Sequence, residues 1–214
     1  MQNTLSELVA LHVDRLKSLR GADPATIIAA ARAAVDAIEA AVGQPSRSLT
    51  DDERAALMAA QRLAYNAAAD GWPGWDDAPP PRPDSPEDLR RGFELACRSQ
   101  VLVQRLDLGP VRQGTGQWMI GAYHLALDEI DAALTSFGSG LTQCELAPAP
   151  GLAWLLRGYI AIAHEVAGRP LAEGVATFDE VQAAIRAGAF DDASEWCDQL
   201  TTARRVFARP GARP

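Results

Sequence analysis

Three histidines are the residues of this sequence whose chemistry most readily suggests a reaction. They are His12, His124 and His164, and each lies near the apolar face of a different predicted helix. Three imidazoles that converge inside a helical bundle would make a metal site, since imidazole is a common ligand of zinc. Helical metal sites usually place two ligands one turn apart, yet the sequence has no His-x-x-x-His and no Glu-x-x-His motif. We therefore interpret them as separate, hydrogen-bonded histidines and expect no cofactor, with a small metal-dependent enzyme as the alternative.

Acidic and nucleophilic residues follow patterns that have a structural explanation. Asp51-Asp52, Asp128-Glu129 and Asp191-Asp192 fall in the first turns of predicted helices, where carboxylates interact favourably with the helix dipole. No Gly-x-Ser-x-Gly nucleophile motif is present. The run Gly114-Thr-Gly-Gln lacks the Gly-Lys-Ser/Thr ending of a phosphate-binding loop, so we predict a flexible turn there. The sequence therefore names no catalytic residue, which favours a non-enzymatic role.

The composition indicates a helical protein whose partners are not polyanions. Hydrophobic residues make up 48% of the 214 residues and aromatic residues only 6%, and alanine is abundant, which favours packed helices over sheets. The formal net charge of -8 argues against nucleic acid and against an anionic membrane surface as partners. No apolar stretch approaches the length of about 20 residues that a membrane span needs. We expect a soluble, cytoplasmic, all-α protein.

Apolar spacing and capping residues predict about nine amphipathic helices joined mostly by short turns. Asp23 before Pro24 marks the start of one helix, and Thr50 three residues before Glu53 forms a capping box for another. We predict an N-terminal region over 1–106, with four helices and a proline-rich loop at 70–85, and helical hairpins over 107–214. One continuous domain is the alternative. In the second region the predicted helices cover 117–125, 128–142, 152–167, 171–187 and 191–207.

Two tryptophans lie in the proline-rich loop. Trp72 and Trp75 flank the Pro-Gly pair at the start of this loop. Long loops inside compact domains are uncommon, and they often carry a function or link domains. The two indoles therefore have two interpretations. They fold back onto the helices as packing, or they form a contact surface for a partner.

The segment from Gln117 resembles the first helix of a tetratricopeptide repeat. Such helices carry an aromatic residue, a large apolar residue and then a small residue at the point where the paired helix crosses. Ile120 followed by Gly121 fits that place, and Ala133 and Phe137 stand at the separation expected for the second helix. The resemblance implies a stack of antiparallel helical hairpins.

Two later segments show the same similarity in different registers. Trp154, Gly158 and Ala161 resemble another first helix, and Gly188, Phe190 and Ala193 resemble a turn with its second helix. The two registers assign different roles to the helix that ends at Ala187. Small residues at helix crossings also occur in other tightly packed bundles, so such a bundle stays an open alternative over residues 115–207.

The resemblance implies protein–protein binding, because helical solenoids present a concave face made largely by first helices. We therefore predict a non-enzymatic module that binds a peptide or a partner protein. A structural homo-oligomer is a further alternative. The candidate contact residues are Trp118, Tyr159, Gln182 and Arg186, together with Trp72 and Trp75 of the loop.

Overall fold

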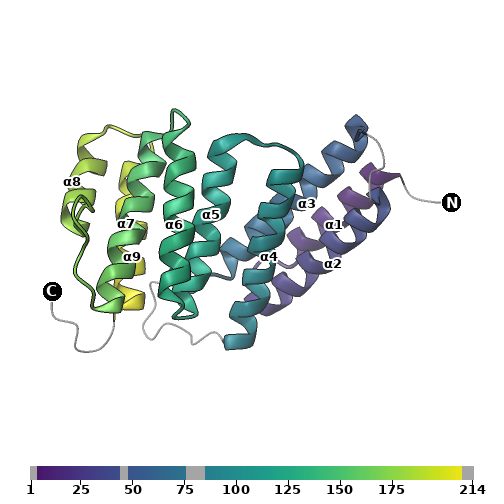
Figure 1. Ribbon diagram of the computed structural model, residues 1–214. Coiled ribbons are helices and arrows are strands. Elements are labelled where there is room, and N and C mark those ends of the chain that lie inside the picture. Colours follow the sequence, from purple (N-terminus) through teal and green to yellow (C-terminus); the bar gives the residue numbers. More distant parts are fainter. Residues whose placement is uncertain (1–3, 44–47, 76–84, 209–214) are drawn as a thin grey trace. The chain divides into compact units, whose positions relative to one another are not determined.

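The computed structural model describes residues 4–43, 48–75 and 85–208. These residues form nine α-helices and one short 3-10 helix, and none of them lies in a strand. The predicted all-α fold is therefore confirmed (Figure 1). The elements are α1 (Leu5–Ser18), α2 (Pro24–Val42), α3 (Asp51–Asp70), η1 (Pro73–Trp75), α4 (Pro86–Arg105), α5 (Gly109–Ala126), α6 (Ile130–Glu145), α7 (Pro150–Ala167), α8 (Phe178–Ala187) and α9 (Ala193–Phe207).

The chain divides into two compact units. Unit 1 comprises residues 1–71 and 90–109, and unit 2 comprises residues 72–89 and 110–214. The last of the three changes between units, after residue 109, lies three residues from the predicted boundary after residue 106. The segment that contains the two loop tryptophans belongs to unit 2 instead of the N-terminal region. Of the predicted loop at 70–85, residues 76–84 lie outside the described residues.

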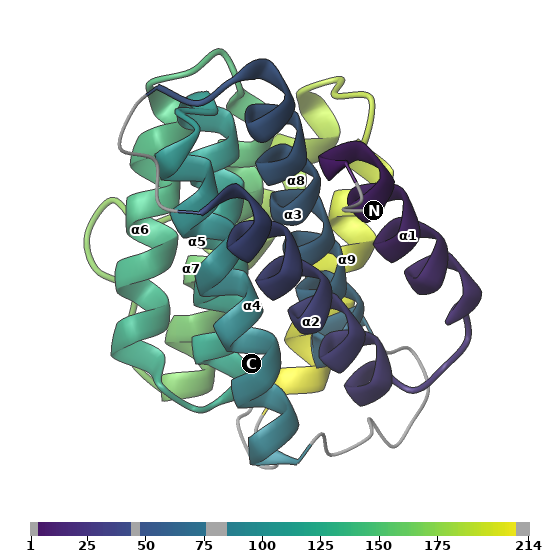
Figure 2. The same cartoon turned by 90° about the vertical axis from the view of Figure 1, so that its right-hand side faces the viewer.

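Alanines form the centre of unit 1. The pair α2 and α3 packs through Ala31, Ala34, Ala60 and Ala64, which are almost completely buried. Short side chains let two helix backbones approach closely. Figure 2 shows α2 between α1 and α4, and α1 contributes no buried residue to the unit. The predicted helix starts are confirmed, because Asp23 accepts a hydrogen bond from the Thr26 amide (3.0 Å) and Thr50 caps α3.

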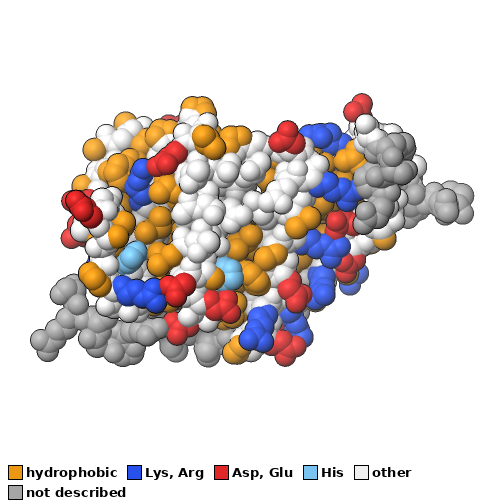
Figure 3. All heavy atoms as spheres, in the orientation of Figure 1, with side chains coloured by type: hydrophobic (Ala, Val, Ile, Leu, Met, Phe, Trp, Pro, Cys, Tyr) orange, Lys and Arg blue, Asp and Glu red, His pale blue; other side chains and the backbone are white. Residues whose placement is uncertain are grey.

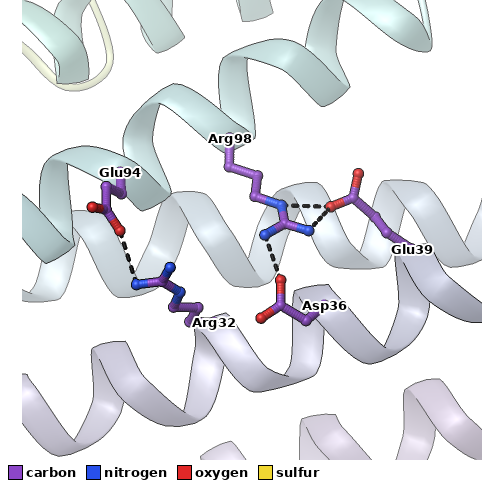
Figure 4. Close-up of polar contacts among 5 residues, drawn as sticks. All are labelled: Arg32, Asp36, Glu39, Glu94 and Arg98. Carbon is purple, nitrogen blue, oxygen red and sulfur yellow. Dashed lines mark hydrogen bonds and ion pairs between the residues drawn. The ribbon is translucent and has the colours of Figure 1, made fainter.

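Ion pairs between charged side chains connect α4 to α2. The guanidinium of Arg98 on α4 binds the carboxylates of both Asp36 and Glu39, and Arg32 donates to Glu94 at 2.9 Å (Figure 4). Partial burial lowers the pKa of Arg98, but the hydrogen bonds to the two carboxylates outweigh it and raise the pKa overall. Figure 3 shows basic and acidic side chains interleaved over this part of the molecule, whereas the surface of α6 is largely uncharged.

A hydrogen bond inside unit 1 joins α3 to α4. The side-chain nitrogen of Gln61 donates to the Ser99 hydroxyl at 2.9 Å, and both residues are buried. A buried polar pair is costly to break, because each group would then lose a hydrogen-bond partner away from water. The contact therefore fixes how α4 rotates against α3.

Glycines set the spacing of α5 and α6 in unit 2. Figure 1 shows α5, α6 and α7 side by side in chain order. A side-chain carbon at Gly121 would lie 2.6 Å from the ring of Phe137, so Gly121 of α5 lies directly against Phe137 of α6. One at Gly114 would lie 2.6 Å from the Cys144 sulfur. The flexible turn predicted at 114–117 is therefore wrong: these residues lie inside α5, where the glycines admit α6 at short range.

The helix predicted over 171–187 is also shorter than expected. It begins only at Phe178, because Thr177 and Glu180 form a reciprocal capping box at its start. Gly174 takes a φ of +83°, which a helix does not allow. Both α8 and α9 pack against α7, and a side-chain carbon at Gly158 of α7 would lie 2.6 Å from Leu200 of α9.

Alanine substitution of one glycine on α5 and one on α6 distinguishes the effect of packing on stability from the effect of helix propensity. An added methyl at Gly138 meets no atom within 4 Å, so Gly138→Ala should raise the free energy of unfolding by about 0.5–1 kcal/mol. The same methyl at Gly121 would force the buried Phe137 ring to move, so Gly121→Ala should lower that free energy by about 1–3 kcal/mol. Urea unfolding followed by circular dichroism measures both. Equal gains at the two positions would contradict the close helix crossing.

Loss of the Arg98 contacts should weaken unit 1. Arg98→Ala leaves two carboxylates without their cation, and we expect the free energy of unfolding to fall by about 1 kcal/mol. The difference should shrink at high salt, because partly exposed charges are screened. Arg62→Ala is the control, since Arg62 is exposed on α3 and forms no ion pair within the described part of the chain. Thermal unfolding at two salt concentrations tests this, and an equal loss in both variants would refute it.

Candidate functional site

A cluster of aromatic rings forms around Trp72 in unit 2. Trp72 is only 2% exposed, and its indole N–H donates to the backbone oxygen of Ala122 at 2.9 Å. Its ring centroid lies 5.1 Å from that of Trp75 and 5.8 Å from those of Trp118 and Tyr159. Tilted and edge-to-face pairs at these separations are favourable beyond the area that they bury. The cluster therefore fixes η1 against α5 and α9.

The two loop tryptophans have different environments. Trp72 takes the packing role, whereas Trp75 remains 41% exposed although its ring contacts Trp72 and Trp118. Gly74 between them has no room for a side chain, because an added carbon would lie 2.1 Å from the Trp72 ring. The Trp-Pro-Gly-Trp sequence thus turns one indole into the core and holds the next at the surface.

Four of the six predicted contact residues are buried. Trp72, Trp118, Tyr159 and Gln182 lie inside unit 2, and Arg186 is exposed. These four side chains are therefore not available on the surface for contact with a partner. Trp72 and Trp118 instead contact the exposed indole of Trp75, and Tyr159 packs against both of these supporting rings.

Gln182 joins α8 to α9. Its side-chain nitrogen donates to the backbone oxygen of Cys197 at 3.0 Å, and its side-chain oxygen accepts a hydrogen bond from Arg186 at 2.7 Å. Both ends of this buried amide are therefore bonded within the protein. Gln182 is a linker between two helices, and Arg186 is held beside it.

An open pocket lies between Trp75 and one face of α9. It has a volume of about 430 Å³, within the usual range of about 300–1,000 Å³ for ligand pockets. The α9 residues recur at steps of three and four along the helix, so they share one face. We call this the α9 pocket. It is lined by Trp75, Asp192, Glu195, Trp196, Asp198, Gln199 and Thr202.

The lining of the α9 pocket is acidic. Asp192, Glu195 and Asp198 are exposed, and none forms an ion pair with another described residue. Asp192 precedes α9 at the capping position, but its side chain makes no capping hydrogen bond. Gln199 donates to the Tyr159 hydroxyl at 2.7 Å, which leaves its side-chain oxygen as an acceptor. Apart from Thr202, the polar lining therefore offers hydrogen-bond acceptors.

Sequence reasoning missed most of this pocket. The acidic pair before α9 had a sufficient explanation in the helix dipole, and Trp196 was not among the candidate contact residues. Trp196 does pack: a side-chain carbon at Gly151 would lie 2.2 Å from its ring. The spacing of Glu195, Asp198 and Thr202 could have indicated a shared face. Nothing in the sequence indicated that Trp75 would lie opposite that face.

The histidines show no sign of a common site. His12 lies on α1 in unit 1, and the other two lie in unit 2. His124 Nδ1 lies 2.7 Å from a Glu129 carboxylate oxygen, whereas the buried Nδ1 of His164 has no hydrogen-bond partner. Across 4–43, 48–75 and 85–208, no three His, Cys, Asp or Glu side chains are grouped so that they could hold a metal ion.

The three thiols are poor nucleophiles. Burial raises the pKa of Cys97, Cys144 and Cys197, and a neighbouring carboxylate adds to the effect at each of them. At Cys197 the charge of Arg186 opposes the rise without cancelling it. The thiolate is the reactive form, so a raised pKa keeps these side chains unreactive near neutral pH.

Comparison with known proteins leaves the site to be interpreted from its own geometry. No protein-family model, curated protein or solved structure was found to match this chain. The resemblance to tetratricopeptide repeats therefore stays a prediction. Within the described ranges, no helix combines the length and the apolar character that a membrane crossing requires.

The two loop tryptophans should differ sharply in their contribution to stability. Trp72→Ala removes a buried ring and its hydrogen bond, so the free energy of unfolding should fall by about 3–5 kcal/mol. Trp75→Ala removes a half-exposed ring, and we expect a loss of roughly 1–1.5 kcal/mol from its aromatic contacts. Chemical unfolding of both variants measures the difference. Similar losses would mean that the two indoles do not have the environments described.

Proposed function

We propose that this protein is a non-enzymatic interaction module that binds a segment of a partner protein at the α9 pocket. The observation that carries the proposal is the exposed indole of Trp75 beside this pocket. A large aromatic side chain on a surface is the residue type most often found at the energetic centre of protein interfaces. Trp75 is 41% exposed, whereas the nearby Trp72 is buried.

Rigid support makes Trp75 suitable as an anchor for a partner. Its ring contacts Trp72 edge-on at 5.1 Å and Trp118 at 5.9 Å. A side chain that is held before binding loses less conformational freedom when the partner arrives. The hydrogen bond from Trp72 to the Ala122 oxygen fixes the base of this support. A partner would therefore meet a preformed surface.

The helical architecture supports the same proposal. The helix α9 packs against α7, α8 and η1, and one of its faces lines the α9 pocket. A tetratricopeptide-like array would have such a surface for peptides. We also propose a cytoplasmic setting, because the three cysteines form no disulfide and reducing compartments keep thiols free.

Affinity capture with matched variants tests the proposal. The full chain, Trp75→Ala and Leu146→Ala would each be used as bait, and captured proteins would be quantified by mass spectrometry. Leu146 is a fitting control because it is 72% exposed in unit 2 and does not line the α9 pocket. We expect Trp75→Ala to weaken binding of at least one captured protein about tenfold or more, as for a typical hot spot.

The captured protein must then bind the purified chain directly. Titration calorimetry with wild type and both variants gives the affinities, and Leu146→Ala should match the wild type. The proposal is wrong if Trp75→Ala retains every partner with unchanged affinity. Capture of the same chain, lost with Trp75→Ala, would instead support the homo-oligomer.

A further inference from the structure

Among its described lining residues, the α9 pocket has three carboxylates and no balancing positive charge. The three carboxylates recur three residues apart, at 192, 195 and 198, so consecutive ones are neighbours on the helix surface. Like charges at this spacing repel each other. None of the described residues that line the pocket is a lysine or an arginine. A cationic group placed there would relieve the repulsion of all three carboxylates.

Carboxylates and aromatic rings already bind arginine side chains elsewhere in this chain. On α2, Asp36 and Glu39 are also three residues apart, and the single guanidinium of Arg98 binds both (Figure 4). In unit 2, the guanidinium of Arg157 lies 4.8 Å from the centre of the Trp154 ring and donates to Glu145 at 2.6 Å.

The α9 pocket combines carboxylates with an aromatic ring, and none of its described lining residues is a cation. It has carboxylates three residues apart, as on α2, and the partly exposed ring of Trp75. We propose that it receives an arginine side chain from a basic segment of the partner protein. This inference rests on the proposed function, and it adds the chemistry of the segment that the pocket recognises.

Arginine fits this lining better than lysine does. A guanidinium is planar, so it can stack on an indole while its N–H groups reach carboxylates in its own plane. Its five donors match a polar lining dominated by acceptors, including the side-chain oxygen of Gln199. A lysine ammonium is a compact, strongly hydrated charge and cannot stack in this way. The net charge of -8 further favours a basic segment over an acidic one.

Binding of defined peptides to the full chain tests the inference. A fluorescent ten-residue glycine–serine peptide with three arginines would be titrated with protein and followed by anisotropy. Matched peptides would carry three lysines or three citrullines, because citrulline keeps the shape of arginine and removes its charge. We expect the arginine peptide to bind most tightly and the citrulline peptide at least about tenfold more weakly.

Paired variants assign the binding to the α9 pocket. Glu195→Gln with Asp198→Asn should weaken the arginine peptide about tenfold or more. Glu173→Gln with Asp179→Asn changes the net charge equally at exposed positions outside the pocket, so it should have little effect. In nuclear magnetic resonance spectra, the peptide should shift the indole N–H signal of Trp75 and leave that of the buried Trp72 nearly unchanged.

Several results would overturn the inference. They are equal binding of the citrulline peptide, tighter binding of the lysine peptide, and equal losses from the two pairs of charge variants. If the arginine peptide fails while Trp75→Ala still abolishes capture of a partner, the proposed function stands and only the arginine assignment is wrong. If Trp75→Ala retains all partners and the arginine peptide still binds at Glu195 and Asp198, the proposed function fails on its own.

Discussion

The burial of Trp72 is the constraint on which the candidate site depends. Its indole has both an apolar body and a hydrogen-bond donor, and the structure satisfies the two together by placing the ring among aromatic side chains and the N–H on the Ala122 oxygen. A buried indole N–H without an acceptor would be costly. The position of η1 therefore follows from one side chain, and the exposure of Trp75 follows from the position of η1.

Short side chains provide the second constraint, and they do so differently in the two units. Unit 1 uses alanines at the crossing of α2 and α3, which keeps high helix propensity while the backbones approach. Unit 2 uses glycines such as Gly114 and Gly121, which lower helix propensity but admit a cysteine and an aromatic ring. Tertiary packing must offset this lower helix propensity. Because such packing is not visible in the local sequence, the glycines at 114 and 116 were predicted to form a turn.

The sequence was sufficient to predict the elements that local chemistry determines. Capping by Asp23 and Thr50 depends on residues a few positions apart, and the structure confirms it. The start of α8 was predicted too early, although Thr177 and Glu180 carry a local signal for it. The α9 pocket could not be predicted, because it requires Trp75 to meet residues more than a hundred positions later in the chain.

The acidic residues of α9 admit a structural explanation and a functional one, and position separates them. The helix dipole favours carboxylates at the start of a helix, so it accounts for Glu195 in the first turn, and in part for Asp192 before it. The effect fades beyond that turn. Asp198 lies beyond it and is exposed, and it brings a third negative charge into the same pocket. Its charge raises the pKa of the adjacent Cys197 thiol, one of several influences on that group. Within the described chain Asp198 has no cationic partner and no capping role. A cation supplied by a bound partner would give this carboxylate the interaction that the fold leaves out.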